Sequence, residues 1–509
     1  MQESSKWRHP ALISPLLAAG VCALLALVAW SGLLEGVELQ GYDLLVASRG
    51  DRQPAENIVV VDFDEASVRT YNAFPIPRRL LADVLEKIAA GQPGVIGLDV
   101  ILDKERAAQD DRHLAEVIGS AGNIILVSEY GFERLPRNEP LPMFAEAAAG
   151  VGFGDLPRDA DGSVRRAFLF AKATDYKRLA FPVAVASYFS EQELKPGQPG
   201  FLLFGNTEIP LIYTNPDSTL VQFWNSFPAQ TVPVQRLLAT DFDATLFKGK
   251  IVLVGQSSQF GKDLVNTPVF RFRRPTGGRA ELSGAEVQAA AIQTLLSGKT
   301  IRKLDARWHW VLNFALIGLL IGALVTLRPL YSVPLMIAGL AGVYLLALHL
   351  FSSHGTWMPF LSTEAGVILA LPAGLGYRYL EERRLKRLVE AERRQLMGLF
   401  ERYVSSDVAA EIWKRRDEIV LAGEERVATV LFSDIRSFTA LTAGKPSSEV
   451  LKWLNTYLTA MSRVIADNRG YLNKYMGDGI MAFWNAPVKQ SDHAFRACQC
   501  ALKSMRRLK

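Results

Sequence analysis

The chain has 509 residues, more than one hydrophobic core usually serves, so two or more domains are expected. Its residues are 49% hydrophobic and only 21% charged, which excludes an intrinsically disordered chain and indicates that part of the apolar content lies in lipid. The net charge of +5 is a mild excess, so no nucleic acid is expected as a partner. The cysteines are Cys22, Cys498 and Cys500, and this spacing excludes a disulfide framework in the long region between them.

The first apolar stretch, residues 11–34, contains no charged side chain. A helix of this length crosses a hydrocarbon core of about 30 Å, so a transmembrane helix is predicted after a short cytoplasmic N-terminus, residues 1–10. A cleaved signal peptide is the alternative, because Lys6 and Arg8 precede the stretch. The stretch is longer than a typical signal-peptide core and lacks a clear cleavage site.

Three more apolar stretches predict transmembrane helices over residues 308–327, 331–351 and 358–377. Four spans place both chain ends on one side of the membrane. The loop 352–357 has no Lys or Arg. Basic residues instead precede the first span, lie between the second and third, and follow the fourth: Lys6, Arg8, Arg328, Arg378, Arg383, Arg384, Lys386 and Arg387. The positive-inside rule therefore predicts cytoplasmic termini and an extracytoplasmic region, in the inner (cell) membrane of a bacterial-type cell.

Two features inside these spans could be functional. Gly318 and Gly322 form a small-xxx-small pair that would let another helix approach closely, although chance occurrence in a glycine-rich helix explains it equally well. Glu364 is an acid near the outer end of the last span, where an interfacial position is the simpler interpretation than a role inside the membrane.

The extracytoplasmic region, residues 35–305, alternates strand-like and helix-like runs from Asn57 onward, which predicts an α/β domain with a largely parallel sheet. Acids fall at or just beyond predicted strand ends, where open α/β sheets bind ligands or metals: Asp62, Asp64, Asp99 and Asp103. Helix caps and turns explain the same acids.

The segment KIVLVGQSSQFGKD, residues 250–263, has the outline of a strand entering a phosphate loop. Its spacing is wrong, because five residues separate Gly255 from Gly261, and Asp263 follows Lys262 where a P-loop has Ser or Thr. A nucleotide site is therefore not expected here.

Several segments of this region resemble the CHASE sensor domain of the second type. They are DLLVASRG, VVVDFDEASV, IPRRLLADVLEKI, GVIGLDVIL, KIVLVGQSSQFGKDLVNTP and GAEVQAAAIQTLLSGKTI, in this order. The resemblance implies an extracytoplasmic sensor followed by three spans, upstream of a cyclase, kinase or phosphatase. It names no ligand, so an unknown extracytoplasmic ligand is expected.

Residues 378–423 are predicted to form a juxtamembrane coupling helix. Leu380, Leu385 and Leu388 recur at roughly helical spacing, while Glu392 interrupts the seam. A short coiled coil between two protomers and a solvated helix whose arginines meet lipid headgroups are both open interpretations. The stretch FERYVSSDVAAEIW, residues 400–413, resembles the element that precedes many class III cyclase catalytic domains.

The chemistry is expected in residues 424–509. A β-rich run delivers Asp434 to the end of a strand, an amphipathic helix follows, and two short strands then meet at Asp478 in a hairpin. Two carboxylates on adjacent strands suit a two-metal phosphoryl-transfer site with Mg²⁺ or Mn²⁺. Turn acids are common, so these residues alone do not define a site.

The segments FSDIRSFTAL and NKYMGDGIMAFW resemble the two signature motifs of class III adenylate and guanylate cyclases. The resemblance implies a ferredoxin-like, palm-type α+β domain. Its metal ligands would be Asp434, Asp478 and the carbonyl of Ile435. Phe438 and Thr439 fall where family backbone amides meet the triphosphate, and Lys474 matches the lysine that contacts adenine, although an exposed strand lysine is its simpler interpretation.

This resemblance implies that the protein is an adenylate cyclase, a phosphorus–oxygen lyase that converts ATP to cyclic AMP and pyrophosphate with two metal ions. The family's active site is shared across a dimer, so a homodimer is expected. The family's second purine-selecting residue and its transition-state Asn and Arg are expected beyond Lys509, which would make this catalytic domain partial. The alternatives are a guanylate cyclase and a non-catalytic receptor whose cyclase segment is a dimerisation or docking module.

Overall fold

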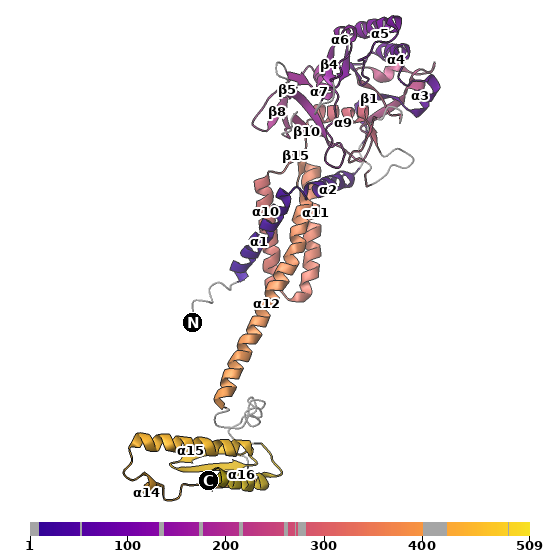
Figure 1. Cartoon of the computed structure of the whole chain (residues 1–509). Helices are drawn as coiled ribbons and strands as arrows, with labels where there is room; N and C mark the ends of the chain where they lie inside the picture. The colour runs from indigo at the N-terminus through magenta and orange to yellow at the C-terminus, as the bar shows by residue number, and fades with distance from the viewer. Residues whose placement is uncertain are drawn as a thin grey trace. The chain divides into compact units, whose positions relative to one another are not determined.

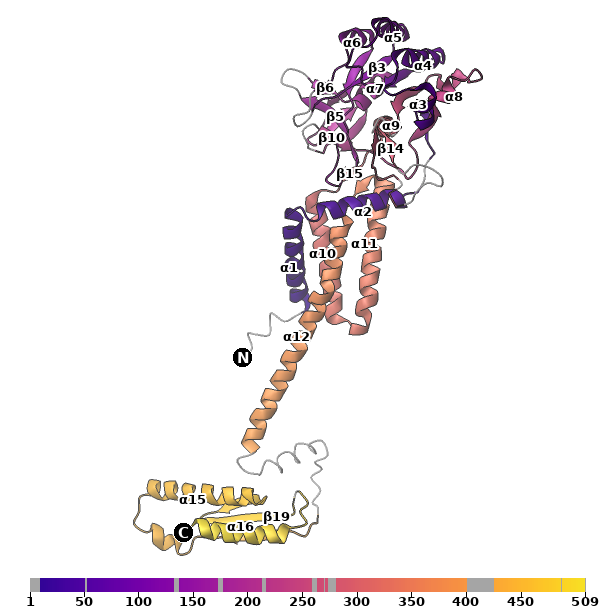
Figure 2. The same cartoon turned by 45° about the vertical axis from the view of Figure 1, so that its right-hand side comes forward.

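The structure is a computed structural model, and it describes residues 10–50, 53–131, 137–172, 177–212, 217–258, 263–269, 271–272, 281–400, 425–486 and 488–508. The chain divides into two compact units, Met1–Tyr377 and Arg378–Lys509, and each is described by itself. Figures 1 and 2 show the chain from two directions.

The core of the sensor region is a six-stranded sheet with the order β11-β1-β12-β2-β3-β4, and all of its pairings are parallel. Its strands are β1 (Ala55–Phe63), β2 (Val95–Leu98), β3 (Ile124–Ser128), β4 (Gly150–Phe153), β11 (Ala229–Pro233) and β12 (Ile251–Gln256). These runs are rich in Val and Ile, and the central strands are buried on both faces, as parallel sheets require.

Helices cover both faces of this sheet. One layer contains α3 (Glu65–Tyr71), α4 (Arg78–Ala90), α5 (Ala108–Ala121), α6 (Pro142–Ala147) and α8 (Val234–Leu237). The short helix η3 (Ala244–Phe247) packs with this first layer. The other layer contains α7 (Phe181–Ser190) and α9 (Gly284–Ser297). Alternate residues of β1 divide between the two layers, Val59 and Val61 facing one and Ile58 and Val60 the other. The predicted α/β fold of the sensor region is confirmed.

Smaller antiparallel sheets complete this region. One contains β5 (Arg166–Lys172), β6 (Lys177–Leu179) and β10 (Asp217–Leu220), and another contains β7 (Leu194–Pro196), β8 (Phe201–Phe204) and β9 (Thr207–Pro210). A short pair joins β13 (Leu264–Val265) to β14 (Leu282–Ser283).

Four helices are long and apolar enough to cross a membrane. They are α1 (Pro10–Trp30), α10 (Ala306–Thr326), α11 (Ser332–His354) and α12 (Phe360–Phe400), with the short turn η4 (Pro329–Tyr331) between α10 and α11. A further helix, α2 (Glu35–Ser48), follows α1 and lies across the ends of the spans in Figure 2. The predicted four-span arrangement agrees with these helices.

Helix α1 packs along α10 at the glycine pair noted in the sequence. A Cβ built on Gly318 would lie 3.6 Å from the Ala18 Cβ, and one built on Gly322 would lie 3.5 Å from the Ser14 Oγ. The absent side chains therefore allow the two helices to approach closely. This packing favours a retained first span over a cleaved signal peptide.

After the end of α12, the described residues of the second unit form three strands and three helices. They are β17 (Thr429–Ser433), α14 (Phe438–Thr442), α15 (Ser447–Asp467), β18 (Tyr471–Met476), β19 (Gly479–Trp484) and α16 (His493–Arg507). The antiparallel sheet has the order β17-β19-β18, and α15 and α16 pack on one of its faces around Trp484. The indole Nε1 of Trp484 donates a hydrogen bond of 2.8 Å to the carbonyl of Asn468 at the end of α15. This layout agrees with the predicted α+β domain.

The coupling segment is only partly described. Helix α12 continues to Phe400, and Leu380, Leu385 and Leu388 are exposed along it. Residues 401–424, which include most of the stretch expected before the catalytic domain, lie outside the described residues.

Candidate active site

A hairpin brings the two predicted metal-binding aspartates to the same end of the small sheet. Asp434 follows β17, whose last residue, Ser433, pairs with Ile480 of β19. Gly477 and Asp478 form the turn between β18 and β19, and a φ of +69° at Gly477 is the conformation that favours glycine in such turns. A Cβ built on Gly479 would lie 3.3 Å from Asp434 Oδ1, so Asp434 sits directly beside the turn that carries Asp478.

Strand register also places Lys474 on the same sheet face as Asp434. Met481 pairs with Lys474 on one side and with Phe432 on the other, so these three side chains share a face. Asp434 is two residues after Phe432 and therefore belongs to this face. Phe432 and Lys474 are exposed, which leaves the face open in this chain.

The segment after Asp434 turns back before entering α14. The backbone N–H of Phe438 donates a hydrogen bond of 3.2 Å to the carbonyl of Ile435. The family resemblance implies that the Ile435 carbonyl binds a metal ion and that the Phe438 N–H binds the triphosphate. In this structure the two groups are instead hydrogen-bonded to each other. Thr439 is exposed on α14, one residue further along.

An aromatic stack fixes α14 against α15. The ring of Phe438 lies 6.2 Å from that of Trp453, which in turn lies 6.5 Å from that of Tyr457. The Tyr457 hydroxyl is within 3.4 Å of the Ser433 Oγ, next to Asp434. The sequence analysis did not identify this stack, although Trp453 and Tyr457 lie four residues apart on the predicted helix.

The donor set at the hairpin suits a hard divalent cation. Asp434 is exposed, Asp478 is half-exposed, and neither carboxylate forms an ion pair with another described residue. Magnesium is commonly held by one or two carboxylates together with substrate phosphates, so two aspartates and a carbonyl fit it. The described residues contain no cluster of three or more His, Cys, Asp or Glu side chains that could hold a metal without such help.

The sensor carboxylates at the strand ends fall into two groups. Asp64 accepts a hydrogen bond of 2.8 Å from the Ser67 backbone N–H and caps α3. Of the two interpretations given for it, Asp64 therefore has the role of a helix cap. Asp62 and Asp99 instead lie at the ends of β1 and β2, close enough to Asp263 to influence its charge. Burial, despite a backbone hydrogen bond from Gly284, raises the pKa of Asp263 to about 7.

Asp263 was not among the predicted ligand residues, because the sequence analysis considered it only within the segment that has the outline of a phosphate loop. Residues 259–262 of that segment, including Gly261 and Lys262, lie outside the described residues. Among the residues that the structure describes, Asp103 forms no metal-binding cluster with the other acids.

A buried ion-pair network joins α2 to the sensor fold. The Arg165 guanidinium donates to both carboxylate oxygens of Asp43, at 2.7 and 2.8 Å. It also contacts Asp159 and Asp161, and the side chains of Arg165 and Asp43 are 1% and 0% exposed. Because charges this deeply buried need partners, this network holds α2 in one orientation.

Comparison with known protein families matches two parts of the chain. The family model of the CHASE2 domain matches residues 20–327, which is more than half of the chain. The model of the adenylate and guanylate cyclase catalytic domain matches residues 421–509, the part that contains the aspartate hairpin. Both resemblances noted in the sequence are confirmed.

Curated relatives match the cyclase end of the chain. "Adenylate cyclase 1" of Rhizobium meliloti (strain 1021) is 40% identical over 80 residues, which are 16% of this chain and 12% of the relative. An uncharacterised protein of Mycobacterium tuberculosis (strain H37Rv) is 37% identical over 112 residues, 22% of this chain and 19% of that protein. The chain thus spans less than a fifth of the length of these relatives. From the fold, the hairpin and these matches, the chain belongs to the CHASE2 family and carries a segment of the adenylate and guanylate cyclase catalytic domain.

Proposed function

We propose that this protein is a membrane receptor-type adenylate cyclase whose extracytoplasmic sensor domain regulates conversion of ATP to cyclic AMP and pyrophosphate. The observation that carries the proposal is the register of β17, β19 and β18, which puts Asp434 beside the Asp478 turn within the cyclase-family segment. The relative named "Adenylate cyclase 1" supports ATP as the substrate rather than GTP.

In the proposed reaction the ribose 3′-oxygen of ATP attacks the α-phosphorus. A new bond between the 3′-oxygen and the α-phosphorus closes the ring, and the 3′-hydroxyl proton passes to solvent. The bond between the α-phosphorus and the oxygen that bridges to the β-phosphorus breaks, and pyrophosphate leaves with its electron pair. Asp434, Asp478 and the Ile435 carbonyl would hold Mg²⁺ or Mn²⁺. When bound, such ions make the attacking hydroxyl more acidic and neutralise the negative charge of the departing pyrophosphate.

The remaining predicted residues would bind and orient the nucleotide. Lys474 lies on the open sheet face with Asp434 and would donate a hydrogen bond to adenine. The backbone amides of Phe438 and Thr439 would receive the triphosphate, which requires the Phe438 N–H to leave the Ile435 carbonyl. The aromatic stack of Phe438, Trp453 and Tyr457 would keep this segment in place.

A homodimer would cover the open sheet face. Val430 and Phe432 are 45% and 64% exposed on that face, a large apolar exposure for a soluble domain. A second cyclase segment packed there would bury them beside the aspartates.

We also propose the inner (cell) membrane as the location, with the sensor outside and the cyclase segment inside. Arginine and lysine flank the predicted cytoplasmic ends of the spans, and residues 352–357, from the end of α11 toward α12, include neither. ATP is a cytoplasmic substrate, which agrees with this orientation.

The test is product identification from membranes that contain the full-length protein. MnATP and MnGTP are supplied separately, and the nucleotide products are identified by mass spectrometry. Cyclic AMP with pyrophosphate from ATP supports the proposal. Cyclic GMP alone would make the protein a guanylate cyclase, and no cyclic nucleotide from either substrate would favour the non-catalytic docking module.

A further inference from the structure

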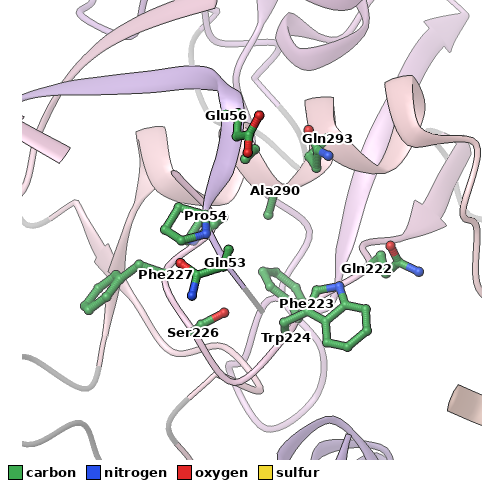
Figure 3. A pocket seen from close by; sticks show the side chains of 12 residues that line it. Gln53, Pro54, Glu56, Gln222, Phe223, Trp224, Ser226, Phe227, Ala290 and Gln293 are labelled. Atoms are coloured by element: carbon green, nitrogen blue, oxygen red, sulfur yellow. The ribbon is translucent and has the colours of Figure 1, made fainter. Parts of the chain in front are cut away.

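A pocket of about 320 Å³ opens on the sensor domain between the start of β1, residues 222–228 and helix α9. Figure 3 shows its lining side chains, with Pro54 and Gln53 on one side and Phe223 and Trp224 on the other. This volume lies at the lower end of the range for small-molecule sites, so the pocket suits a compact ligand.

The walls combine apolar faces with neutral hydrogen-bonding groups. Phe223 is buried and forms part of the floor, and Trp224 is half-buried beside it. Gln53, Gln222 and Gln293 supply side-chain amides, which can both donate and accept hydrogen bonds. This combination suits a ligand that has several hydroxyl groups and an apolar ring face.

One amide oxygen in the wall lacks a partner. Oε1 of Gln293 is buried and accepts no hydrogen bond from any residue that the structure describes. A buried acceptor without a donor is costly, and a rotation of the Gln293 amide toward the pocket would let a ligand hydroxyl supply the missing bond.

The charge of the lining argues against an anionic ligand. The described residues of the lining include no lysine or arginine, and the acid among them, Glu56, is exposed. A carboxylate or phosphate in this pocket would find no cation among these lining residues, and the nearby Arg49 guanidinium is already stacked on the Trp224 ring. An uncharged ligand fits the lining without a charge penalty.

Trp224 of the lining, and Val221, which precedes it in the chain, contact α2 and the Arg49 that caps it. The Tyr42 hydroxyl of α2 donates a hydrogen bond of 3.2 Å to the carbonyl of Val221, next to Gln222. The Arg49 guanidinium lies over the Trp224 ring, 3.9 Å from its centroid. A ligand that moves residues 222–224 would therefore act directly on both contacts of α2.

We propose that this pocket is the ligand site of the sensor domain, and that it takes an uncharged, polyhydroxylated molecule of monosaccharide size. Gln293 and the neighbouring amides bind its hydroxyl groups, and the aromatic side chains contact its ring. The signal passes to α2 through Val221 and Trp224. The effect of the ligand on cyclic AMP formation rests on the proposed cyclase function, whereas binding of the ligand to the pocket does not.

The test measures binding of D-glucose, D-galactose, D-xylose and D-ribose to the full-length protein in nanodiscs. Saturation-transfer NMR reports contact, and titration gives the dissociation constant. Saturable binding of at least one sugar is expected, weakened about tenfold by Gln293→Leu, which removes the unpaired acceptor. Gln198→Ala, in an exposed loop away from the pocket, should leave binding unchanged.

Two further variants test the assignment. Trp224→Leu should also weaken binding, and Glu56→Gln should change it less than about twofold if the ligand is uncharged. The proposal is overturned if no sugar binds saturably, if Gln293→Leu and Trp224→Leu bind as tightly as the wild type, or if Glu56→Gln abolishes binding.

Cyclic nucleotide formation measured on the same samples separates this proposal from the proposed function. Failure of all four sugars to bind while cyclic AMP is formed would overturn only the pocket assignment. Sugar binding without cyclic nucleotide formation would support the pocket and contradict the proposed function.

Discussion

The carboxylate of Glu38 accepts a hydrogen bond of 2.6 Å from the backbone N–H of Ser362. A second bond of 3.3 Å comes from the Leu361 N–H. Glu38 lies on α2, and the two amides are in the first turn of α12, the last span. A negative charge at a helix N-terminus satisfies amides that have no partner within the helix. Helix α2 therefore contacts both the sensor fold and the helix that leads toward the cyclase segment.

Replacing this cap should destabilise the membrane-proximal part of the protein. Glu38→Gln keeps the side-chain size but removes the charge, so we expect a loss of about 1 kcal/mol in the free energy of unfolding. The thermal unfolding midpoint in detergent micelles measures it. Glu35→Gln, an exposed position on the same helix, is the matched control. Equal midpoints for both variants would show that the Glu38 contact contributes nothing.

The buried pair of Asp43 and Arg165 should contribute more. Asp43→Ala leaves the Arg165 guanidinium buried with fewer acceptors, so a loss of about 3 kcal/mol is expected. Chemical denaturation followed by circular dichroism gives the difference. Glu193→Ala removes an exposed partner of Lys195 and should have little effect. If Asp43→Ala lowers the free energy of unfolding by less than about 1 kcal/mol, Asp159 and Asp161 are sufficient partners for the buried Arg165 guanidinium, which would contradict this prediction.

The sensor domain should lose stability as the pH rises from about 4 to about 7. Burial raises the pKa of Asp263 to about 7, whereas an unfolded aspartate titrates near 4. The folded state therefore binds more protons than the unfolded state across this window, and its stability falls as they are lost. Burial and the charge of Asp263 also raise the pKa of Asp99.

Asp263→Asn should flatten this dependence, as measured by thermal unfolding between pH 4 and pH 8. Asp83→Asn, at an exposed position on α4, should retain the wild-type dependence. An unchanged pH profile in Asp263→Asn would contradict the assignment.

Local patterns in the sequence predicted much of the fold. The four spans follow from uninterrupted apolar runs, and the aspartate hairpin follows from two strand-like runs around Gly477. Both features depend on neighbouring residues, so periodicity and turn chemistry are sufficient to identify them. The sequence analysis rejected a phosphate loop in residues 250–263 on spacing, and it did not consider Asp263 as a ligand residue.

The connections between distant segments could not be predicted. Glu38 contacts Ser362 across more than three hundred residues, and Arg165 contacts Asp43 across more than one hundred. The sensor pocket likewise joins residues near 54, 223 and 293. Such contacts depend on how whole elements pack, and a single sequence carries no local signal for that packing.

Lys474 should contribute to nucleotide binding more than to the rate of the chemical step. Lys474→Ala removes the proposed hydrogen bond to adenine, so we expect KM for ATP to rise about tenfold with a smaller change in kcat. Steady-state kinetics in membranes with MnATP test this. Asn473→Ala, at the adjacent exposed position, serves as the control. A loss of kcat without a change in KM would contradict the binding role.

The proposed account depends most on the two aspartates at the hairpin, Asp434 and Asp478. The direct measurement is the rate of cyclic AMP formation from MnATP in membranes, for the wild type, Asp434→Asn and Asp478→Asn. Asp467→Asn, at an exposed position on α15, is the control. We predict a decrease of about a hundredfold or more for each hairpin variant and none for the control, because both carboxylates would hold the metal ions. Wild-type rates in either hairpin variant would contradict the account.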